Sequence, residues 1–207
     1  MRTKLTVTLA LLLILAALAA CGGVQKETLE DGAVVTRREG GDMYSFSRLP
    51  RDISYAGETI QLTEFHALSM QGSNYNHSGY FVTVIDASSL TDEQFHWLLE
   101  ADLDIDVYIK GGENELEFSS VTHLRTYYTD KTLYACFITP LSKSFRHSFL
   151  GADITLSVDV KENGKRDEYA YRITLDEDNC AILAEDLPAE IHDNLLNALQ
   201  DYSGAMR

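Results

Sequence analysis

Residues 154–175 read ITLSVDVKENGKRDEYAYRITL, two runs of alternating apolar and polar side chains around the pair Asn163-Gly164. Alternation at period two is typical of a strand with one buried face, and Asn-Gly is the preferred pair for a two-residue type I′ hairpin turn. Such a turn predicts three facing apolar pairs: Ile154 with Ile173, Leu156 with Tyr171 and Val158 with Tyr169. The turn and the pattern therefore predict the same register.

A second alternating run covers residues 102–110, DLDIDVYIK, which places Leu103, Ile105, Val107 and Ile109 on one face. Gly111-Gly112 then permits a tight turn, and a two-residue loop there would set Val107 opposite Leu116 and Ile105 opposite Phe118. Further segments rich in Tyr, Thr, Ile and Val predict strands at 59–68, 80–85, 124–128 and 132–139.

Two segments carry a helical pattern instead. Thr91 can form a capping box with Gln94, and Phe95, Leu98 and Leu99 follow at helical spacing. Near the end, Pro188 can open a helix whose apolar stripe is Ile191, Leu195, Leu196, Leu199 and Tyr202, closed by Gly204. The fold class predicted is mainly β: an antiparallel sandwich of immunoglobulin-like architecture with two accessory helices. The alternative is an α+β layer in which the first helix crosses over between two parallel strands.

The first twenty residues look like an export signal. Arg2 and Lys4 precede an uncharged apolar run that ends at Ala20 and is too short to cross a bilayer comfortably. The end of this run and the two residues after it, Leu18-Ala19-Ala20-Cys21-Gly22, resemble the lipobox of bacterial lipoproteins. The resemblance implies cleavage before Cys21, acylation of its thiol, and a membrane-anchored protein on the extracytoplasmic side of a bacterial cell membrane. The alternative is an ordinary signal cut after an Ala-x-Ala type site, which would leave Cys21 as a plain thiol.

The domain organisation follows from this signal. Residues 1–20 are predicted to be removed, and the polar, glycine-bearing segment 21–41 is predicted to be a flexible tether with at most one short strand. Residues 42–207 are predicted to form a single globular β-rich domain. Two acyl chains would hold this domain on a membrane without spanning it.

The chain carries a formal net charge of −15. A surface of this sign repels phosphate backbones, so no nucleic-acid partner is expected. Besides Cys21, the cysteines are Cys136 and Cys180, in a compartment where a disulfide is permitted. Their spacing leaves two interpretations open, a disulfide between them or two buried thiols, and neither lies in a Cys-x-x-Cys motif.

Acidic side chains are the most suggestive candidates for a cation site. Asp102, Asp104, Asp106, Ile109 and Glu113 occupy positions 1, 3, 5, 8 and 12 of an EF-hand-like count. Position 6, which needs Gly, is Val107, and strand alternation explains the intervening apolar residues, so no metal ligand is predicted. In the predicted hairpin, Asp106 would lie opposite Glu117 and Tyr108 opposite Glu115, with Asp104 one step along the same face. These carboxylates would repel one another unless a cation lies beside them, for which Arg125, Arg172 or Lys131 could serve.

Catalytic motifs are absent from the sequence. The histidines are scattered, without zinc-site spacing, and there is no nucleophile elbow, phosphate-binding loop or dinucleotide fingerprint. No catalytic residue and no cofactor is therefore predicted. Tyrosines are frequent: Tyr75 and Tyr80 flank a polar loop, and Tyr127, Tyr128 and Tyr134 crowd a predicted hairpin. Strand and core roles fit them best, and the loop from Ser69 to Gly79 is the candidate contact surface.

Taken together, these features favour a non-enzymatic binding or accessory module of the bacterial envelope. Its partners would be the membrane, through the lipid anchor, and an envelope protein, peptide or glycan. The alternatives are a hydrolase acting on wall polymers or peptides with a site built from dispersed residues, and a calcium-dependent binding module.

Overall fold

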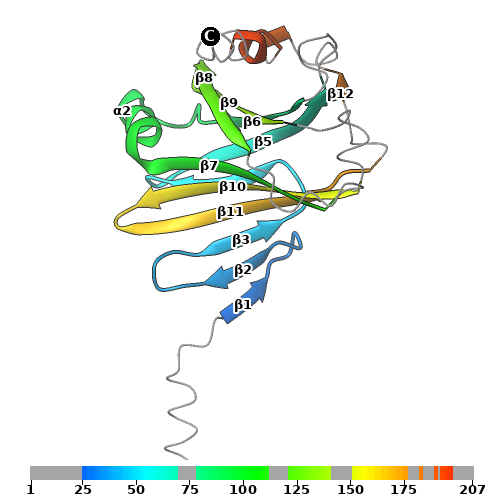
Figure 1. Cartoon of the computed structure of the whole chain (residues 1–207). Coiled ribbons are helices and arrows are strands. Elements are labelled where there is room, and N and C mark those ends of the chain that lie inside the picture. Colours follow the sequence, from blue (N-terminus) through cyan, green and yellow to red (C-terminus); the bar gives the residue numbers. More distant parts are fainter. Residues whose placement is uncertain are drawn as a thin grey trace, which may run out of the picture.

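The computed structural model describes residues 25–69, 78–111, 121–140, 151–176, 182–183, 189–190 and 192–197. Within these residues the chain forms two β-sheets, called sheet 1 and sheet 2 here, that pack face to face (Figure 1). Helical residues are few. The fold is therefore mainly β, mostly antiparallel and sandwich-like, as the alternating runs predict.

Sheet 1 has the strand order β1-β2-β3-β11-β10-β7. Neighbouring strands are antiparallel except β3 and β11, which run parallel. In chain order its strands are β1 (Gln25–Thr28), β2 (Val34–Arg37), β3 (Met43–Phe46), β7 (Leu103–Gly111), β10 (Ala152–Glu162) and β11 (Lys165–Thr174).

Sheet 2 has the strand order β12-β5-β6-β9-β8, and β4 pairs with β5 along the same edge as β12. The β5–β12 pair is parallel and the other pairs are antiparallel. In chain order its strands are β4 (Arg51–Tyr55), β5 (Glu58–Ser69), β6 (Ser78–Asp86), β8 (Thr122–Thr129), β9 (Thr132–Pro140) and β12 (Ile182–Leu183).

The β10–β11 hairpin has the predicted register. Asn163 and Gly164 adopt φ values of 50° and 77°, the left-handed conformation that a type I′ turn needs at both central residues. The three predicted pairs are all present: Ile154 faces Ile173, Leu156 faces Tyr171 and Val158 faces Tyr169. The prediction from residues 154–175 is confirmed.

The main core lies between the two sheets and is built from their inward-facing alternate residues. Leu156 and Val158 of β10 are fully buried, and so are Leu62 of β5 and Ile85 of β6. Burying an aliphatic or aromatic side chain of this size stabilises the fold by about 1.5–3 kcal/mol. This inward alternation leaves the opposite face of sheet 1 to the polar residues.

Sheet 2, by contrast, is apolar on both faces. In β6, Phe81 and Ile85 point into the main core, whereas Tyr80, Val82 and Val84 belong to a second buried cluster. That cluster includes Leu195, which is 0% exposed, from the helical residues 192–197. The near-continuous apolar run of residues 80–85 is the sequence signature of a strand covered on both sides.

Helix α2 (Asp92–Trp97) has the predicted capping box, with the Thr91 side chain accepting from the Gln94 backbone and the Gln94 side chain accepting from the Thr91 backbone. A π-helical turn, η1 (Leu98–Asp102), continues it into β7. Phe95 and Leu98 are buried, as predicted. Because α2 joins β6 of sheet 2 to β7 of sheet 1, it is not a crossover between parallel strands of one sheet.

The flexible tether predicted for 21–41 is wrong from Gln25 onward. Residues 25–28 and 34–37 form β1 and β2, and Val35, opposite Tyr44 of β3, is fully buried. The turn between them is closed by a hydrogen bond from the Leu29 amide to the Ala33 carbonyl at 2.8 Å. The β-branched run Val34-Val35-Thr36 can bury one face in the sheet, and this outweighs the polar composition around it.

Some predictions lie outside the described residues. They include the hairpin partners Leu116 and Phe118, and the helix residues Pro188, Ile191, Leu199 and Tyr202. Within the described part, β7 pairs with β10, and residues 189–190 and 192–197 are helical. None of the helices found there has the length and apolar character needed to cross a membrane.

Candidate functional site

The outer face of sheet 1 carries the polar residues that alternate with the core. Because Ile109 and Ile154 are buried in the main core, their neighbours Tyr108 and Thr155 point to the other side of the sheet. Successive outward residues line up across β7, β10 and β11 in register. One row is Tyr108, Thr155 and Arg172, and the next is Lys110, Asp153 and Thr174.

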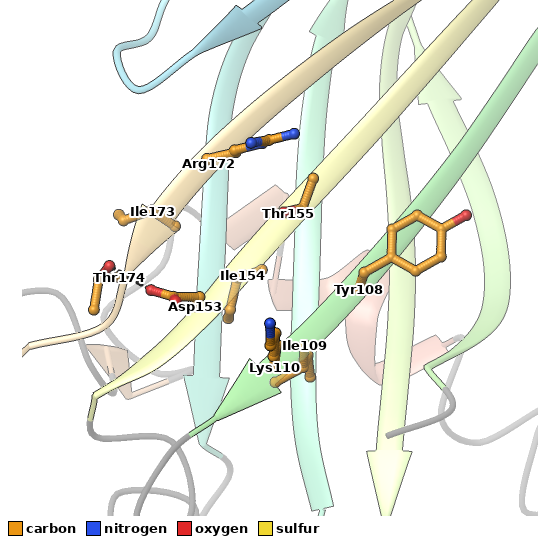
Figure 2. A pocket seen from close by; sticks show the side chains of 9 residues that line it. All are labelled: Tyr108, Ile109, Lys110, Asp153, Ile154, Thr155, Arg172, Ile173 and Thr174. Atoms are coloured by element: carbon orange, nitrogen blue, oxygen red, sulfur yellow. Dashed lines mark hydrogen bonds between the residues drawn. The ribbon is translucent and has the colours of Figure 1, made fainter. Parts of the chain in front are cut away.

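These two rows enclose a hollow of about 450 Å³ near one end of sheet 1 (Figure 2). The six outward side chains line it together with Ile109, Ile154 and Ile173 from the intervening row. Thr155 is short and lies between Tyr108 and Arg172 in register, so a depression forms over β10. Its volume falls within the range of about 300–1,000 Å³ that is usual for small-ligand sites.

Tyr108 is the aromatic side chain of this hollow. It is 52% exposed, and its hydroxyl lies 3.4 Å from a carboxylate oxygen of Asp106. Burial, followed by the charge of Asp106, raises the pKa of Tyr108 above its ordinary value. The ring is thus a neutral, partly exposed platform with a hydrogen-bonding hydroxyl at its end.

Two cations and one carboxylate complete the hollow. Asp153 accepts a hydrogen bond from the Thr174 hydroxyl at 2.6 Å, and it faces Lys110 across the strands. Within the described part of the chain, Lys110 and Arg172 have no hydrogen-bond or ion-pair partner. The hollow therefore has donors available on both sides of β10.

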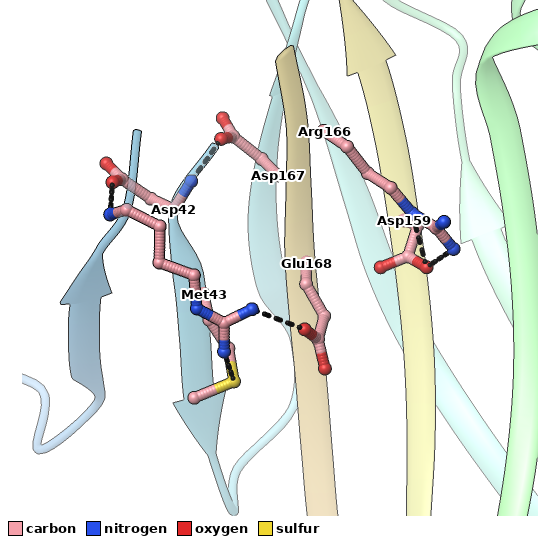
Figure 3. Close-up of polar contacts among 7 residues, drawn as sticks. Asp42, Met43, Asp159, Arg166, Asp167 and Glu168 are labelled. Atoms are coloured by element: carbon pink, nitrogen blue, oxygen red, sulfur yellow. Dashed lines mark hydrogen bonds and ion pairs between the residues drawn. The ribbon is translucent and has the colours of Figure 1, made fainter. Parts of the chain in front are cut away.

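The other end of the same face holds a compact charge cluster (Figure 3). Arg166 donates two hydrogen bonds to Oδ2 of Asp159, the one from Nε at 3.0 Å, and its Nη2 lies 3.5 Å from a carboxylate oxygen of Asp104. Asp159 is 6% exposed, and its Oδ1 is buried without a hydrogen-bond partner among the described residues. Burial raises the pKa of Asp159, while the hydrogen bond from Arg166 opposes the shift.

Next to this cluster, polar contacts join β3 to β11. Arg38 contacts Glu168 at 3.3 Å, and the Asp42 amide donates to Asp167 at 2.7 Å (Figure 3). Gly41 has a φ of 134°, and a Cβ there would lie 2.0 Å from the carbonyl oxygen of Arg166. These contacts hold the parallel pair of strands together, which is a structural role.

The predicted acidic row is divided by the fold. Asp104 and Asp106 do lie on the outer face, but Asp102 accepts a hydrogen bond from the Tyr55 hydroxyl at 2.7 Å. The compensating cation is Arg166, which was not among the three predicted. Lys131 instead pairs with Asp92 at 2.7 Å. Glu113, Glu115 and Glu117 lie outside the described residues, among which no group of three or more His, Cys, Asp or Glu side chains could hold a metal ion.

The described histidines stay apart from one another. His66 contacts Glu64 at 2.7 Å, and His123 lies 3.0 Å from the Thr126 hydroxyl. His96 is close to Glu100, and His192 to Asp193. These are local contacts of exposed or half-buried side chains. His77 and His147 lie outside the described residues.

Cys136 is fully buried in the second cluster, on the face of β9 that is covered by Leu195 and Leu196. Burial raises the pKa of its thiol to about 12. Its predicted partner Cys180 lies outside the described residues, as does the acylation site Cys21, so the disulfide and the lipid anchor stay predictions.

Most of the tyrosines singled out in the sequence are structural. Tyr80 and Tyr134 are buried in the second cluster and Tyr127 packs against it, whereas Tyr128 is 60% exposed and its ring contacts Phe95 edge to face. Of the loop from Ser69 to Gly79, the described ends belong to β5 and β6. Tyr75 and the remainder of the loop lie outside the described residues.

Sequence reasoning placed Tyr108 and Arg172 on strands but did not bring them together. The signal that could have found the site is the outward set of residues in three alternating runs, 102–110, 154–160 and 169–175. It becomes a site only when β7 pairs with β10 at the observed register.

Comparison of the chain with protein-family models, with curated proteins and with solved structures found no match.

Proposed function

We propose that this chain is a lipid-anchored, non-enzymatic binding module of the bacterial envelope that takes its ligand on the outer face of sheet 1. The observation that carries the proposal is the hollow itself, which is lined by the exposed ring of Tyr108, by a short threonine and by two cations, Lys110 and Arg172, that have no ion-pair partner among the described residues. Clefts that combine an apolar platform with a few convergent polar groups are the usual form of ligand sites.

The position of β1 supports an anchor close to the domain. Cys21 and Gln25, the first residue of β1, are four positions apart, and four extended residues span about 14 Å at most. An acylated Cys21 would therefore hold the β1 edge of sheet 1 next to the bilayer. Helical residues 192–197 lie at the opposite end of the molecule from β1 (Figure 1).

The immunoglobulin-like character of the sandwich belongs to the same proposal. It is supported by two facing sheets with inward alternation and a tight hairpin between β10 and β11. In such sandwiches, binding surfaces are formed by loops or by an exposed sheet face, and the hollow on sheet 1 represents the second kind.

The test uses the full chain purified in detergent and immobilised for surface plasmon resonance. The probes are cell-wall glycan fragments and short peptides of defined composition. We expect at least one probe to bind, and Tyr108→Ala to weaken that binding about tenfold, the equivalent of ~1.4 kcal/mol.

The matched control is Tyr128→Ala, which removes a tyrosine of similar exposure from β8 of sheet 2 and should leave binding unchanged. Equal affinities for the two variants would show that the ligand does not bind at the hollow.

A further inference from the structure

We infer that the ligand of the hollow is an acidic saccharide, with one sugar ring stacked on Tyr108 and its carboxylate held by Arg172 and Lys110. The inference rests on the proposed function, because it names the ligand class for the same face. It is drawn from the charge, the shape and the hydrogen-bonding groups of the hollow.

The charge of the hollow is positive in a strongly acidic protein. Lys110 and Arg172 supply two cations and Asp153 supplies one anion, whose carboxylate is hydrogen-bonded to the Thr174 hydroxyl. Among the described residues that line the hollow, the charges sum to one positive charge, although the whole chain has a formal charge of −15. A ligand with a single carboxylate matches this charge, and a guanidinium can bind a carboxylate with two parallel hydrogen bonds.

The charges further along the face exclude polyanions. Asp106 lies beside Tyr108, and Asp104 and Asp159 follow on β7 and β10 toward the Arg166 cluster. A phosphodiester chain extended along β10 would meet these carboxylates with a charge on every unit. A saccharide with isolated carboxylates could place one of them at Lys110 and Arg172 without bringing another next to Asp104, Asp106 or Asp159.

The shape of the hollow suits a sugar ring. Neighbouring strands are about 4.8 Å apart, so the backbones of β7 and β11 are about 10 Å apart with β10 between them. The ring of Tyr108 lies along β7 on one side of this gap, the Arg172 side chain extends from β11 toward β10 on the other, and Thr155 lies between them (Figure 2). A pyranose can stack on the exposed ring while its substituent reaches the cation.

Hydroxyl groups of the ligand would find partners close by. Thr155, Asp153 and the Tyr108 hydroxyl all lie at the hollow and together offer donors and acceptors. A surface with one aromatic platform and several small polar side chains favours a polyhydroxylated ligand over a peptide, whose apolar side chains would need deeper pockets.

The test is isothermal titration calorimetry of the full chain in detergent with methyl galacturonide, a single sugar ring with one carboxylate, and with its methyl ester, which has the same ring without the charge. We expect the acid to bind at least tenfold more tightly than the ester. Arg172→Gln and Lys110→Gln should each lower the affinity for the acid about tenfold and leave the affinity for the ester unchanged. Tyr108→Ala should lower both affinities.

Lys161→Gln is the matched control, since Lys161 is an exposed lysine of β10 beyond the Arg166 cluster, and it should change neither affinity. Equal binding of acid and ester that still depends on Tyr108 would overturn the acidic class and leave the proposed binding face standing. If only an acidic peptide, tested as penta-glutamate, binds in an Arg172-dependent way, the saccharide class is overturned and the proposed binding face still stands. If none of the substitutions at Tyr108, Arg172 and Lys110 changes the affinity for the saccharide, both proposals are overturned.

Discussion

The guanidinium of Arg166 donates two hydrogen bonds to one carboxylate oxygen of Asp159, and the other oxygen of Asp159 is buried without a hydrogen-bond partner in the described part of the chain. The two residues face the same side of the β10–β11 hairpin, and Arg166 is half exposed while the Asp159 side chain is 9% exposed. The ion pair thus keeps the Asp159 carboxylate charged although burial removes it from water. Its contribution to stability depends on which partner is removed.

We expect Arg166→Gln to lower the free energy of unfolding at pH 7 by about 1–3 kcal/mol, because it leaves a buried carboxylate without its counter-ion. Asp159→Asn should be neutral or stabilising by up to about 1 kcal/mol, since it removes the buried charge and Arg166 keeps Asp104 nearby. Urea unfolding of the two variants and of the double variant measures the coupling.

The pH dependence of these variants follows from the raised pKa of Asp159. A native carboxyl with a raised pKa takes up its proton at a higher pH than the unfolded chain does, so the native state gains stability as the pH falls toward the unfolded value of about 3.9. Both differences, the loss in Arg166→Gln and the gain in Asp159→Asn, should therefore shrink on acidification. Differences that stay constant from pH 7 to pH 4 would contradict the assignment.

The two-residue turns give a pair of substitutions with opposite signs. Ala56 and Asn163 both precede a glycine and have φ values of 54° and 50°. Alanine pays about 1 kcal/mol or more for this conformation, and asparagine tolerates it. Ala56→Asn should raise the free energy of unfolding by about 0.5–1 kcal/mol, and Asn163→Ala should lower it by a similar amount, both measured by thermal unfolding. Shifts of the same sign would show that side-chain packing outweighs turn geometry.

Leu195 is the residue through which helical residues 192–197 bury one face of sheet 2. Leu195→Ala should lower the free energy of unfolding by about 2–5 kcal/mol. In a Cys180→Ser background, it should also speed the reaction of Cys136 with a disulfide reagent, because the two side chains share one cluster. Asp193→Ala, at an exposed position of the same segment, is the control and should change neither quantity.

The lipid anchor predicts how close two surface positions lie to the bilayer. In the membrane-bound chain, a fluorophore at Lys26→Cys in β1 should be quenched by nitroxide lipids, and one at Asp193→Cys should not, because these sites lie at opposite ends of the molecule (Figure 1). Mass spectrometry of the mature amino terminus tests acylation of Cys21 directly. A Cys21→Ser chain that still binds vesicles would contradict the anchor.

Local patterns were sufficient for much of the fold. The Asn163-Gly164 turn and its alternating flanks determine one register, because a slip by one residue would move the side chains of Ile154, Leu156 and Val158 to the solvent-exposed face. The capping box at Thr91 is likewise a contact between residues three apart. Such features need no distant partner, so the amino-acid order alone specifies them.

The arrangement of the strands was decided by tertiary structure. Val34 and Val35 sit in a polar, glycine-bearing segment, and only pairing with β3 makes them part of a sheet. In the same way, Lys110 comes beside Asp153 only through the long-range pairing of β7 with β10, whereas Asp153 and Arg172 belong to one local hairpin. The sequence by itself determined which side chains point outward on each strand. Which of them meet to form the hollow depends on backbone pairing between segments about 45 residues apart, and that pairing follows from burying both sheets against one core.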